Sequence, residues 1–313
     1  MRRLATLLPA LFLVPVAACG SQADGSTGGG EGIDAIKVSG EAGTKPSVEF
    51  DTPFKVSETT AKVLRPGDGE ALEAGSQMVV VDYVGLNARN AEEFDSSYKS
   101  GEPAPFPLEE GGLINGFVEG LDGKKVGSRV LIAIPSKDGY AQGNEQAGIR
   151  KGDSLVFVVD VKDASPLVQR AEGEATKPGA GLPTVITNDE NIPTGLTVPA
   201  DATTTKGASA AVIVGDGPEV ADSSTVNFHY AAANAKGEVF ESSWQRGLAT
   251  TLPVQQASEV IPGLDDAIVG QTVGSRVVMV VPKFFADRPD AAKQVGMKPS
   301  DPVYFVVDIR GAA

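Results

Sequence analysis

A duplication of about 147 residues constrains the fold of this chain more than any other feature of its sequence. The segment VGSRV at residues 126–130 recurs at residues 273–277, and each copy is followed by an apolar stretch that ends in proline. The segment LVFVVD at residues 155–160 recurs as VYFVVD at residues 303–308. Because this unit is far longer than the repeat of a solenoid, each copy is expected to fold as a separate domain.

Within each copy, apolar residues alternate with a period of two, which is typical of β-strands that bury one face. The alternation occurs at residues 79–83 and again at residues 226–230, and residues 155–161 predict a later strand. Apolar residues three to four positions apart at residues 113–121 predict one short helix, which the glycines at residues 123–127 end. Each copy is therefore predicted to be an α+β domain, an antiparallel sheet wrapped on one short α-helix.

The composition narrows the chemistry that is available to the chain. Its 313 residues include one cysteine and one histidine, which excludes a disulfide framework, a thiolate metal cage and any zinc site that needs two imidazoles. The formal net charge of −14 at pH 7 argues against nucleic acid as a partner, because phosphate groups require a basic surface. We therefore expect a function that needs neither a metal nor a cofactor.

The amino terminus has the layout of an export signal. Two arginines precede an apolar run at residues 4–16, which is too short to span a membrane and contains two prolines. Residues 16–19 (VAAC) resemble the bacterial lipobox, in which the cysteine is lipidated and becomes the new amino terminus. The alternative is an ordinary signal peptide with an incidental cysteine. Because the single thiol lies at the expected cleavage point, we expect residues 1–18 to be removed and Cys19 to attach the exported protein to the cell membrane.

Composition also predicts the domain boundaries. Residues 19–45 are rich in glycine, serine and threonine and are expected to form a flexible tether. Their glycines do not follow a strand and do not precede Lys-Ser/Thr, so a phosphate-binding loop is discarded. Residues 166–182 contain the sequence GEATKPGAG and are interpreted as a linker. The first domain then covers residues 46–165 and the second covers residues 183–313.

A series of ordered motifs runs through the first copy, between residues 67 and 161. These motifs are YVG at 83–85, FDSS at 94–97, FPL at 106–108, LINGFVEGL at 113–121, KVG at 125–127, IP at 134–135, GY at 139–140 and LVF at 155–157. At this spacing they resemble the FKBP family, the peptidyl-prolyl cis-trans isomerases that bind tacrolimus and rapamycin. The interpretation of single positions such as Phe157 as ordinary core residues remains open.

The resemblance implies a pocket that holds the proline ring of a polypeptide and acts on the amide bond before it. The groups acting on the amide would be the side chains of Tyr83, Asp95 and Tyr140, together with the backbone N–H of Ile114. The remaining contacts with the substrate would come from Phe94, Phe106, Leu113, Phe117, Ile149 and Phe157. Among these, Phe117 would form the floor of the pocket.

Both copies depart from the family pattern. In the first, Ala104 stands where many members have an aromatic residue, and the loop at residues 142–149 lacks the usual prolines. In the second, Glu241 replaces the aspartate, Leu264 stands at the floor position, and no tyrosine matching Tyr140 follows the proline that ends the apolar stretch. We expect weak or no activity in the second copy, with a groove that still binds extended peptide.

The only histidine and the only tryptophan of the chain lie in the second copy. His229 alternates with apolar residues of a predicted strand and is expected to be exposed rather than catalytic. Trp244 follows the FESS motif and is interpreted as a packing or rim residue.

The leading hypothesis is an exported, membrane-attached prolyl isomerase. Its partners would be proline-containing unfolded or exported polypeptides, and the resemblance adds macrolides of the tacrolimus and rapamycin type. The alternative is a non-catalytic chaperone or surface adaptor that binds proline-rich or unfolded segments. Asp95 and Tyr140 favour catalysis in the first copy, whereas the substitutions in the second copy favour binding there.

Overall fold

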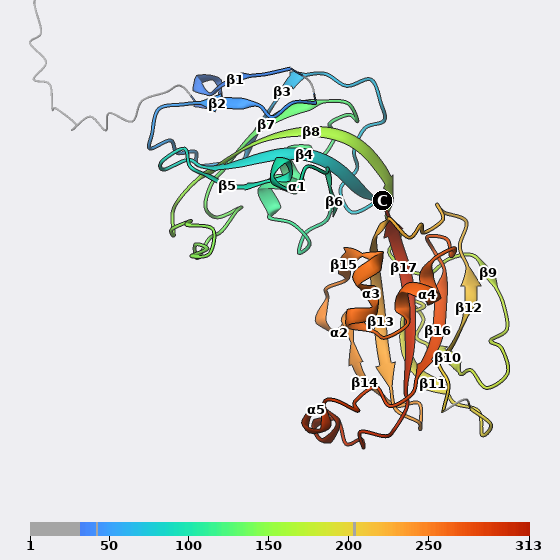
Figure 1. Cartoon of the computed structure of the whole chain (residues 1–313). Coiled ribbons are helices and arrows are strands. Elements are labelled where there is room, and N and C mark those ends of the chain that lie inside the picture. The colour runs from blue at the N-terminus through green and yellow to red at the C-terminus, as the bar shows by residue number, and fades with distance from the viewer. Residues whose placement is uncertain (1–31, 42, 203–204) are drawn as a thin grey trace, which may run out of the picture.

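The computed structural model describes residues 32–41, 43–202 and 205–313, which form two domains with antiparallel sheets (Figure 1). The predicted signal peptide and Cys19 lie outside these residues. The elements of the first domain are η1 (Gly32–Ala35), β1 (Lys37–Ser39), β2 (Ser47–Glu49), β3 (Thr60–Arg65), β4 (Gln77–Asn87), β5 (Glu93–Ser96), η2 (Ser97–Lys99), β6 (Ala104–Pro107), α1 (Asn115–Leu121), β7 (Arg129–Ile134) and β8 (Leu155–Pro166).

The main sheet of the first domain has the strand order β3-β7-β8-β4-β5, and β6 also pairs with β4. Every pairing in it is antiparallel. Helix α1 packs against β7, and glycine permits this close approach, because a Cβ at Gly120 would lie 2.6 Å from Ile132 Cγ2. The predicted antiparallel sheet with one short helix is confirmed for this domain.

Both faces of this sheet are covered, which explains why every residue of β7 is buried. On one face the strands pack with α1 in a core that includes Val81 and Leu121. On the other face they pack against the hairpin of β1 and β2, which contributes Val38 and Val48. The sheet is therefore the middle of three layers.

The β1–β2 hairpin extends the first domain beyond its predicted start at residue 46. Both η1 and β1 lie within the stretch that was expected to be a flexible tether. Ile36, between these two elements, is 6% exposed and belongs to the core beneath the hairpin. The folded part of the first domain therefore begins no later than Gly32. The additional residues cover the second face of the sheet and bury its apolar side chains.

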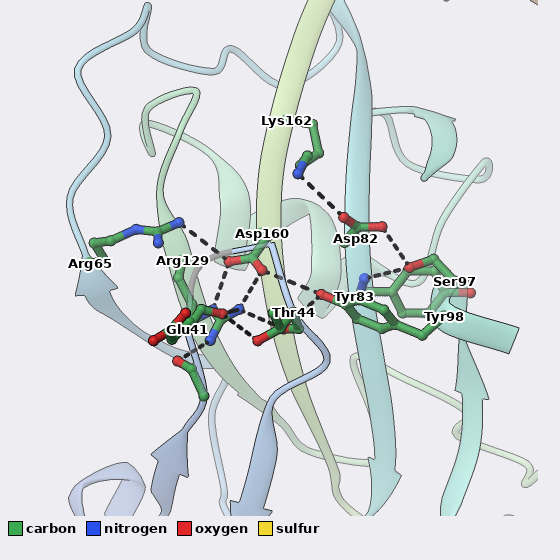
Figure 2. A network of polar contacts seen from close by, with 11 residues as sticks. Glu41, Thr44, Arg65, Asp82, Tyr83, Ser97, Tyr98, Arg129, Asp160 and Lys162 are labelled. Atoms are coloured by element: carbon green, nitrogen blue, oxygen red, sulfur yellow. Dashed lines mark hydrogen bonds and ion pairs between the residues drawn. The ribbon is translucent and has the colours of Figure 1, made fainter. Parts of the chain in front are cut away.

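A buried ion pair joins the hairpin to the sheet (Figure 2). Arg129 on β7 donates two hydrogen bonds, of 2.7 and 2.6 Å, to the carboxylate of Asp160 on β8. Both side chains are about 5% exposed. The same guanidinium donates at 3.1 Å to three backbone carbonyls of the hairpin loop, those of Gly40, Glu41 and Thr44. The pair therefore satisfies its own hydrogen bonds and holds the loop in place.

The second domain repeats this architecture, and β9 from the predicted linker extends its sheet. Its strand order is β14-β13-β17-β16-β12-β9, and β15 pairs with β13. The elements are β9 (Glu174–Ala175), β10 (Thr184–Thr187), β11 (Pro193–Thr197), β12 (Ala208–Val214), β13 (Thr225–Ala233), β14 (Val239–Ser242), α2 (Ser243–Arg246), β15 (Thr250–Pro253), η3 (Val254–Gln256), α3 (Ala257–Val260), α4 (Leu264–Ile268), β16 (Arg276–Val281), α5 (Pro289–Gln294) and β17 (Val303–Ala312).

The cover hairpin belongs to the duplicated unit. In the second domain the hairpin of β10 and β11 packs on the same face of the sheet, where Val185 and Leu196 join the core. Arg276 donates to Asp308 at 2.6 and 2.7 Å and to the backbone carbonyl of Asn191 at 2.6 Å. The arginine of the VGSRV motif and the aspartate within the later strand therefore supply the same anchor in both halves.

The helices differ between the domains. The prediction of one helix per copy is wrong for the second domain, which has four short helices among its described residues. Pro262 and Gly263 separate α3 from α4, and a proline cannot continue a helix from the preceding turn. Helix α5 lies in the segment between β16 and β17. In the part of the chain that the structure describes, no helix has both the length and the apolarity to cross a membrane.

The two domains meet where β8 and β17 approach each other (Figure 1). The Ser165 hydroxyl donates to the carbonyl of Ala312, and the N–H of Val168 donates to the carbonyl of Arg310, both at 2.8 Å. Arg310 is 2% exposed, and its guanidinium donates twice at 2.8 Å to Glu109 of the first domain. This ion pair connects β17 to the loop that follows β6.

Candidate active site

Nine of the ten predicted pocket residues meet in one cavity of the first domain, with a volume of about 390 Å³. Strands β4, β5, β6 and β8 supply its walls, α1 supplies its floor, and two loops border it. Its lining consists of Tyr83, Phe94, Asp95, Phe106, Gly111, Gly112, Leu113, Ile114, Phe117, Tyr140 and Phe157. We call it the first-domain cavity.

Aromatic rings in edge-to-face contact form the interior of this cavity. The ring of Phe117, on α1, lies 5.4 Å from Phe157 and 6.3 Å from both Tyr83 and Phe106, with interplanar angles of 72–85°. Phe117 and Phe157 are 3% and 5% exposed. Such pairs hold one another in position, because the positive edge of one ring faces the negative face of the next. The cavity therefore has rigid apolar walls.

Gly85 permits two of these rings to approach the sheet. A Cβ at this position would lie 2.8 Å from Phe157 Cε1 and 2.9 Å from Phe94 Cζ, closer than real Cβ contacts. Phe94 and Phe157 consequently pack edge to face at 5.6 Å across the backbone of β4. The glycine of the YVG motif is explained by this contact.

A hydrogen bond joins two of the predicted catalytic side chains. The Tyr83 hydroxyl donates to Asp95 Oδ2 at 2.6 Å, and the N–H of Ser96 donates to Asp95 Oδ1 at 2.9 Å. Burial, followed by the hydrogen bond to Asp95, raises the pKa of Tyr83 well above its ordinary value. The phenol therefore remains protonated at neutral pH and orients the carboxylate at the exposed rim of the cavity.

Two further hydrogen-bond donors belong to the loops that border the first-domain cavity. Ile114 is the N-cap of α1, and within the described ranges its backbone N–H has no hydrogen-bond partner. Tyr140 lies between β7 and β8, in a loop held by hydrogen bonds from Gly143 N–H and Ser136 Oγ to its carbonyl. Both residues line the cavity, so an N–H and a phenol are available to a ligand there.

Ile149 is the predicted residue that the structure does not bring to the cavity. Its side chain is 2% exposed and packs in the core, while its N–H and carbonyl both pair with Asn144. With its backbone paired to Asn144, Ile149 directs its side chain into the core and not into the cavity. Gly111 and Gly112, which line the cavity, were not predicted, although the two consecutive glycines after β6 were a visible signal of close approach.

The second domain has a cavity at the equivalent place, with a volume of about 450 Å³. Tyr230 and Glu241 line it, and the Tyr230 hydroxyl donates to Glu241 Oε1 at 2.7 Å, as in the first domain. Here, however, Arg246 also forms an ion pair with Glu241, and its guanidinium lies 5.4 Å from the centre of the Tyr230 ring. The carboxylate of this cavity is therefore neutralised by a neighbouring cation.

The floor of the second cavity comes from a different part of the chain. Leu264, at the position of Phe117, is fully buried in the core and does not line the cavity. Phe284, from the loop after β16, packs on Phe305 at 5.2 Å instead, much as Phe117 packs on Phe157. The residues lining this cavity include no phenol from that loop, whose side chains there are Phe284, Phe285 and Arg288. The second cavity keeps the aromatic character of the first and lacks the donor that Tyr140 supplies.

Comparison with known proteins shows which family the chain resembles. The model of the FKBP-type peptidyl-prolyl cis-trans isomerases matches twice, at residues 69–162 and 217–310. The FK506-binding protein of Streptomyces anulatus is 37% identical over 118 residues, which cover 37% of this chain and 94% of that protein. The probable FK506-binding protein of Corynebacterium glutamicum is 36% identical over 121 residues, covering 38% and 98%.

A longer relative matches over a smaller share of its length. The isomerase FkpA of Escherichia coli K12 is 38% identical over 105 residues, which are 34% of this chain and 37% of FkpA. The crystal structure of FkpA from Escherichia coli aligns with a TM-score of 0.31 at 38% identity, covering 34% of this chain and 48% of that one. The two family matches together span more than half of the sequence. The chain therefore belongs to the FKBP-type peptidyl-prolyl cis-trans isomerase family and contains the domain of that family twice.

Proposed function

We propose that the first domain carries the isomerase activity and that it acts by desolvating and twisting the prolyl amide. One observation supports this assignment above all: the Tyr83–Asp95 pair, Tyr140 and the N–H of Ile114 all border one cavity with aromatic walls, and that N–H has no partner among the described residues. A proline ring fits the apolar interior, and the substrate backbone on either side of the prolyl amide then meets the polar groups at the border. The clients would be exported polypeptides that contain proline.

The mechanism follows from the electronic structure of the amide. Rotation about an X-Pro bond has a barrier of roughly 18–20 kcal/mol, because resonance gives the C–N bond double-bond character and places negative charge on oxygen. Removing water from that oxygen destabilises the planar form more than the twisted form. The carboxylate of Asp95 acts in the same direction, because a negative charge near the oxygen disfavours the charge-separated resonance form. Each 1.4 kcal/mol of preference for the twisted amide accelerates rotation about tenfold.

Hydrogen bonds donated by the protein hold the substrate in place while its amide bond rotates. The N–H of Ile114 and the phenol of Tyr140 can each donate to a substrate carbonyl, and neither needs to transfer a proton. The binding energy of these contacts then stabilises the twisted geometry of the amide. The reaction forms no covalent intermediate, because the catalysed step is a rotation about one bond, the amide C–N bond, and no bond is made or broken.

The test is prolyl isomerisation of a proline-containing tetrapeptide by the chain from residue 20 onward, with and without rapamycin. We expect turnover that rapamycin blocks. Tyr140→Phe should lower kcat/KM about two- to tenfold, because a neutral hydrogen bond contributes about 0.5–1.5 kcal/mol. Tyr98→Phe is the matched control, since its hydroxyl lies outside the cavity and donates to the Thr44 carbonyl at 3.2 Å and to Asp160 at 3.5 Å. A folded protein without turnover would refute the assignment.

For the second domain we propose binding of extended peptide without catalysis. The observation that supports it is a cavity of about 450 Å³ whose acidic residue is paired with Arg246 and which has no counterpart of Tyr140 in its lining. Such a cavity retains apolar surface for a proline or an apolar side chain. It lacks both the free carboxylate and the donor on which the mechanism above depends.

We also propose that the protein is exported and attached to the cell membrane by lipid at Cys19. The support is the apolar run before this cysteine, the small residues next to it and the lack of any other thiol in the sequence. Cys19→Ser should move the protein from the membrane fraction of the producing bacterium to the soluble fraction, as measured by fractionation and blotting. Ser21→Ala is the control and should stay in the membrane fraction. Retention of Cys19→Ser in the membrane would contradict the proposal.

A further inference from the structure

A second cavity lies beside the first-domain cavity and is formed by both domains. It has a volume of about 170 Å³, and we call it the interdomain groove. The first domain contributes Glu109, Glu110 and Gly112 to its lining, and the second contributes His229, Trp244, Leu248 and Arg310.

The two cavities are adjacent. Gly112 lines both of them. Gly111 lines the first-domain cavity, and a Cβ at this position would lie 3.9 Å from Leu248 Cδ1 in the interdomain groove. A polypeptide whose proline occupies the first-domain cavity therefore passes onto the second domain when it leaves across these two glycines.

The surface that such a polypeptide would meet carries an exposed leucine and an aromatic stack among polar side chains. Leu248 is 50% exposed and lines the groove, so its side chain is open to contact with a client. Trp244 stacks on His229 with ring centres 5.0 Å apart and an interplanar angle of 23°. His229 is half-buried rather than exposed as expected, and burial together with Arg310 lowers its pKa to about 4. The imidazole is therefore neutral at neutral pH and adds no charge to this surface.

The groove is held by a rigid set of contacts. Besides its two bonds to Glu109, Arg310 donates to the carbonyl of Val168 and to Asn227 Oδ1, both at 3.0 Å. These contacts fix the position of the second domain against the loop that borders the first-domain cavity. Because Arg310 and Glu109 neutralise each other, Glu110, which is exposed, leaves the groove slightly negative.

On the basis of the isomerase activity proposed for the first domain, we propose that the interdomain groove binds the client residues that flank the proline. The occupant is an extended polypeptide with an apolar side chain seated against Leu248 and Trp244. Sites for compact small molecules are roughly 300–1,000 Å³, whereas this groove of about 170 Å³ has room for side chains of an extended chain. The second domain thereby contributes to client selection at the active site of the first.

Two proline peptides distinguish this extended site from the first-domain cavity. One is a tetrapeptide, and the other carries about six additional residues on each side with leucines among them, enough to extend about 20 Å at 3.3 Å per residue. Because Trp244 is the only tryptophan of the chain, its fluorescence reports directly on the interdomain groove. We expect the long peptide to shift Trp244 emission on titration and the tetrapeptide to leave it unchanged.

The variant Leu248→Ser tests the same inference through activity. We expect kcat/KM for the long peptide to fall about fivefold, because a half-exposed leucine would become buried by the client, while kcat/KM for the tetrapeptide stays unchanged. Ile186→Ser is the matched control, since Ile186 is 49% exposed on β10 and outside the groove. Equal effects of Leu248→Ser on both peptides, or a Trp244 emission that saturating long peptide does not change, would overturn the inference. If neither peptide is isomerised, the proposed function fails, and the fluorescence titration still decides whether the groove binds polypeptide.

Discussion

Replacing Asp160 by alanine is expected to lower the free energy of unfolding of the first domain by about 3–5 kcal/mol. The side chain is 5% exposed and receives two hydrogen bonds from Arg129, which is equally buried. Without the carboxylate, the guanidinium remains in a site that water does not reach and has lost its counter-charge. The hairpin carbonyls accept its remaining hydrogen bonds but cannot neutralise it.

Chemical denaturation of the two-domain chain can separate this effect from any change in the second domain. Circular dichroism follows both domains, whereas Trp244 belongs to the second domain and lines the interdomain groove. Asp160→Ala should move the circular dichroism transition of the first domain to lower denaturant. The last change in Trp244 emission, which accompanies unfolding of the second domain itself, should stay at the denaturant concentration of the parent protein. The control is Asp163→Ala, which alters an exposed residue of the same strand and should change stability by less than about 0.5 kcal/mol. If Asp160→Ala lowered the free energy of unfolding as little as the control does, the stabilising role of the Arg129–Asp160 pair would be contradicted.

The second large effect concerns catalysis. Phe94→Ala is expected to lower kcat/KM for a proline tetrapeptide roughly 30-fold. Contact with a large apolar side chain contributes about 1.5–3 kcal/mol, and 1.4 kcal/mol corresponds to a tenfold change in rate. Phe94 is half-buried, packs on Phe157 at 5.6 Å, and lines the first-domain cavity. Its removal opens the wall to water, so the substrate carbonyl would no longer be desolvated.

The duplication provides a matched control for this variant. Phe240 occupies the equivalent position in the second domain, is also half-buried and lines the cavity there. Phe240→Ala should leave tetrapeptide turnover within about twofold of the parent protein, provided that both variants retain the circular dichroism spectrum of the folded chain. A larger loss of turnover in Phe240→Ala than in Phe94→Ala would assign the activity to the second domain instead.

The sequence by itself determined the two domains and most of the first-domain cavity. The duplicated motifs predicted two α+β units, and the period-two strands placed Tyr83 and Phe157 on buried faces where the cavity lies. These features are local, because the alternation of side chains along a strand follows directly from backbone geometry. The FKBP resemblance supplied the remaining residues of the cavity, with the exception that Ile149 turns into the core.

Only the tertiary structure decided which residues meet across the chain. The cover hairpins were missed because β1 and β10 are three and four residues long and carry no apolar pattern of their own. Periodicity identifies a buried residue and not its partner, so the pairing of Arg129 with Asp160 was not readable. The same holds for Arg310 and Glu109, which are 201 residues apart and form the junction beside the active site. Such contacts depend on how separate elements pack, and packing is a property of the folded chain as a whole.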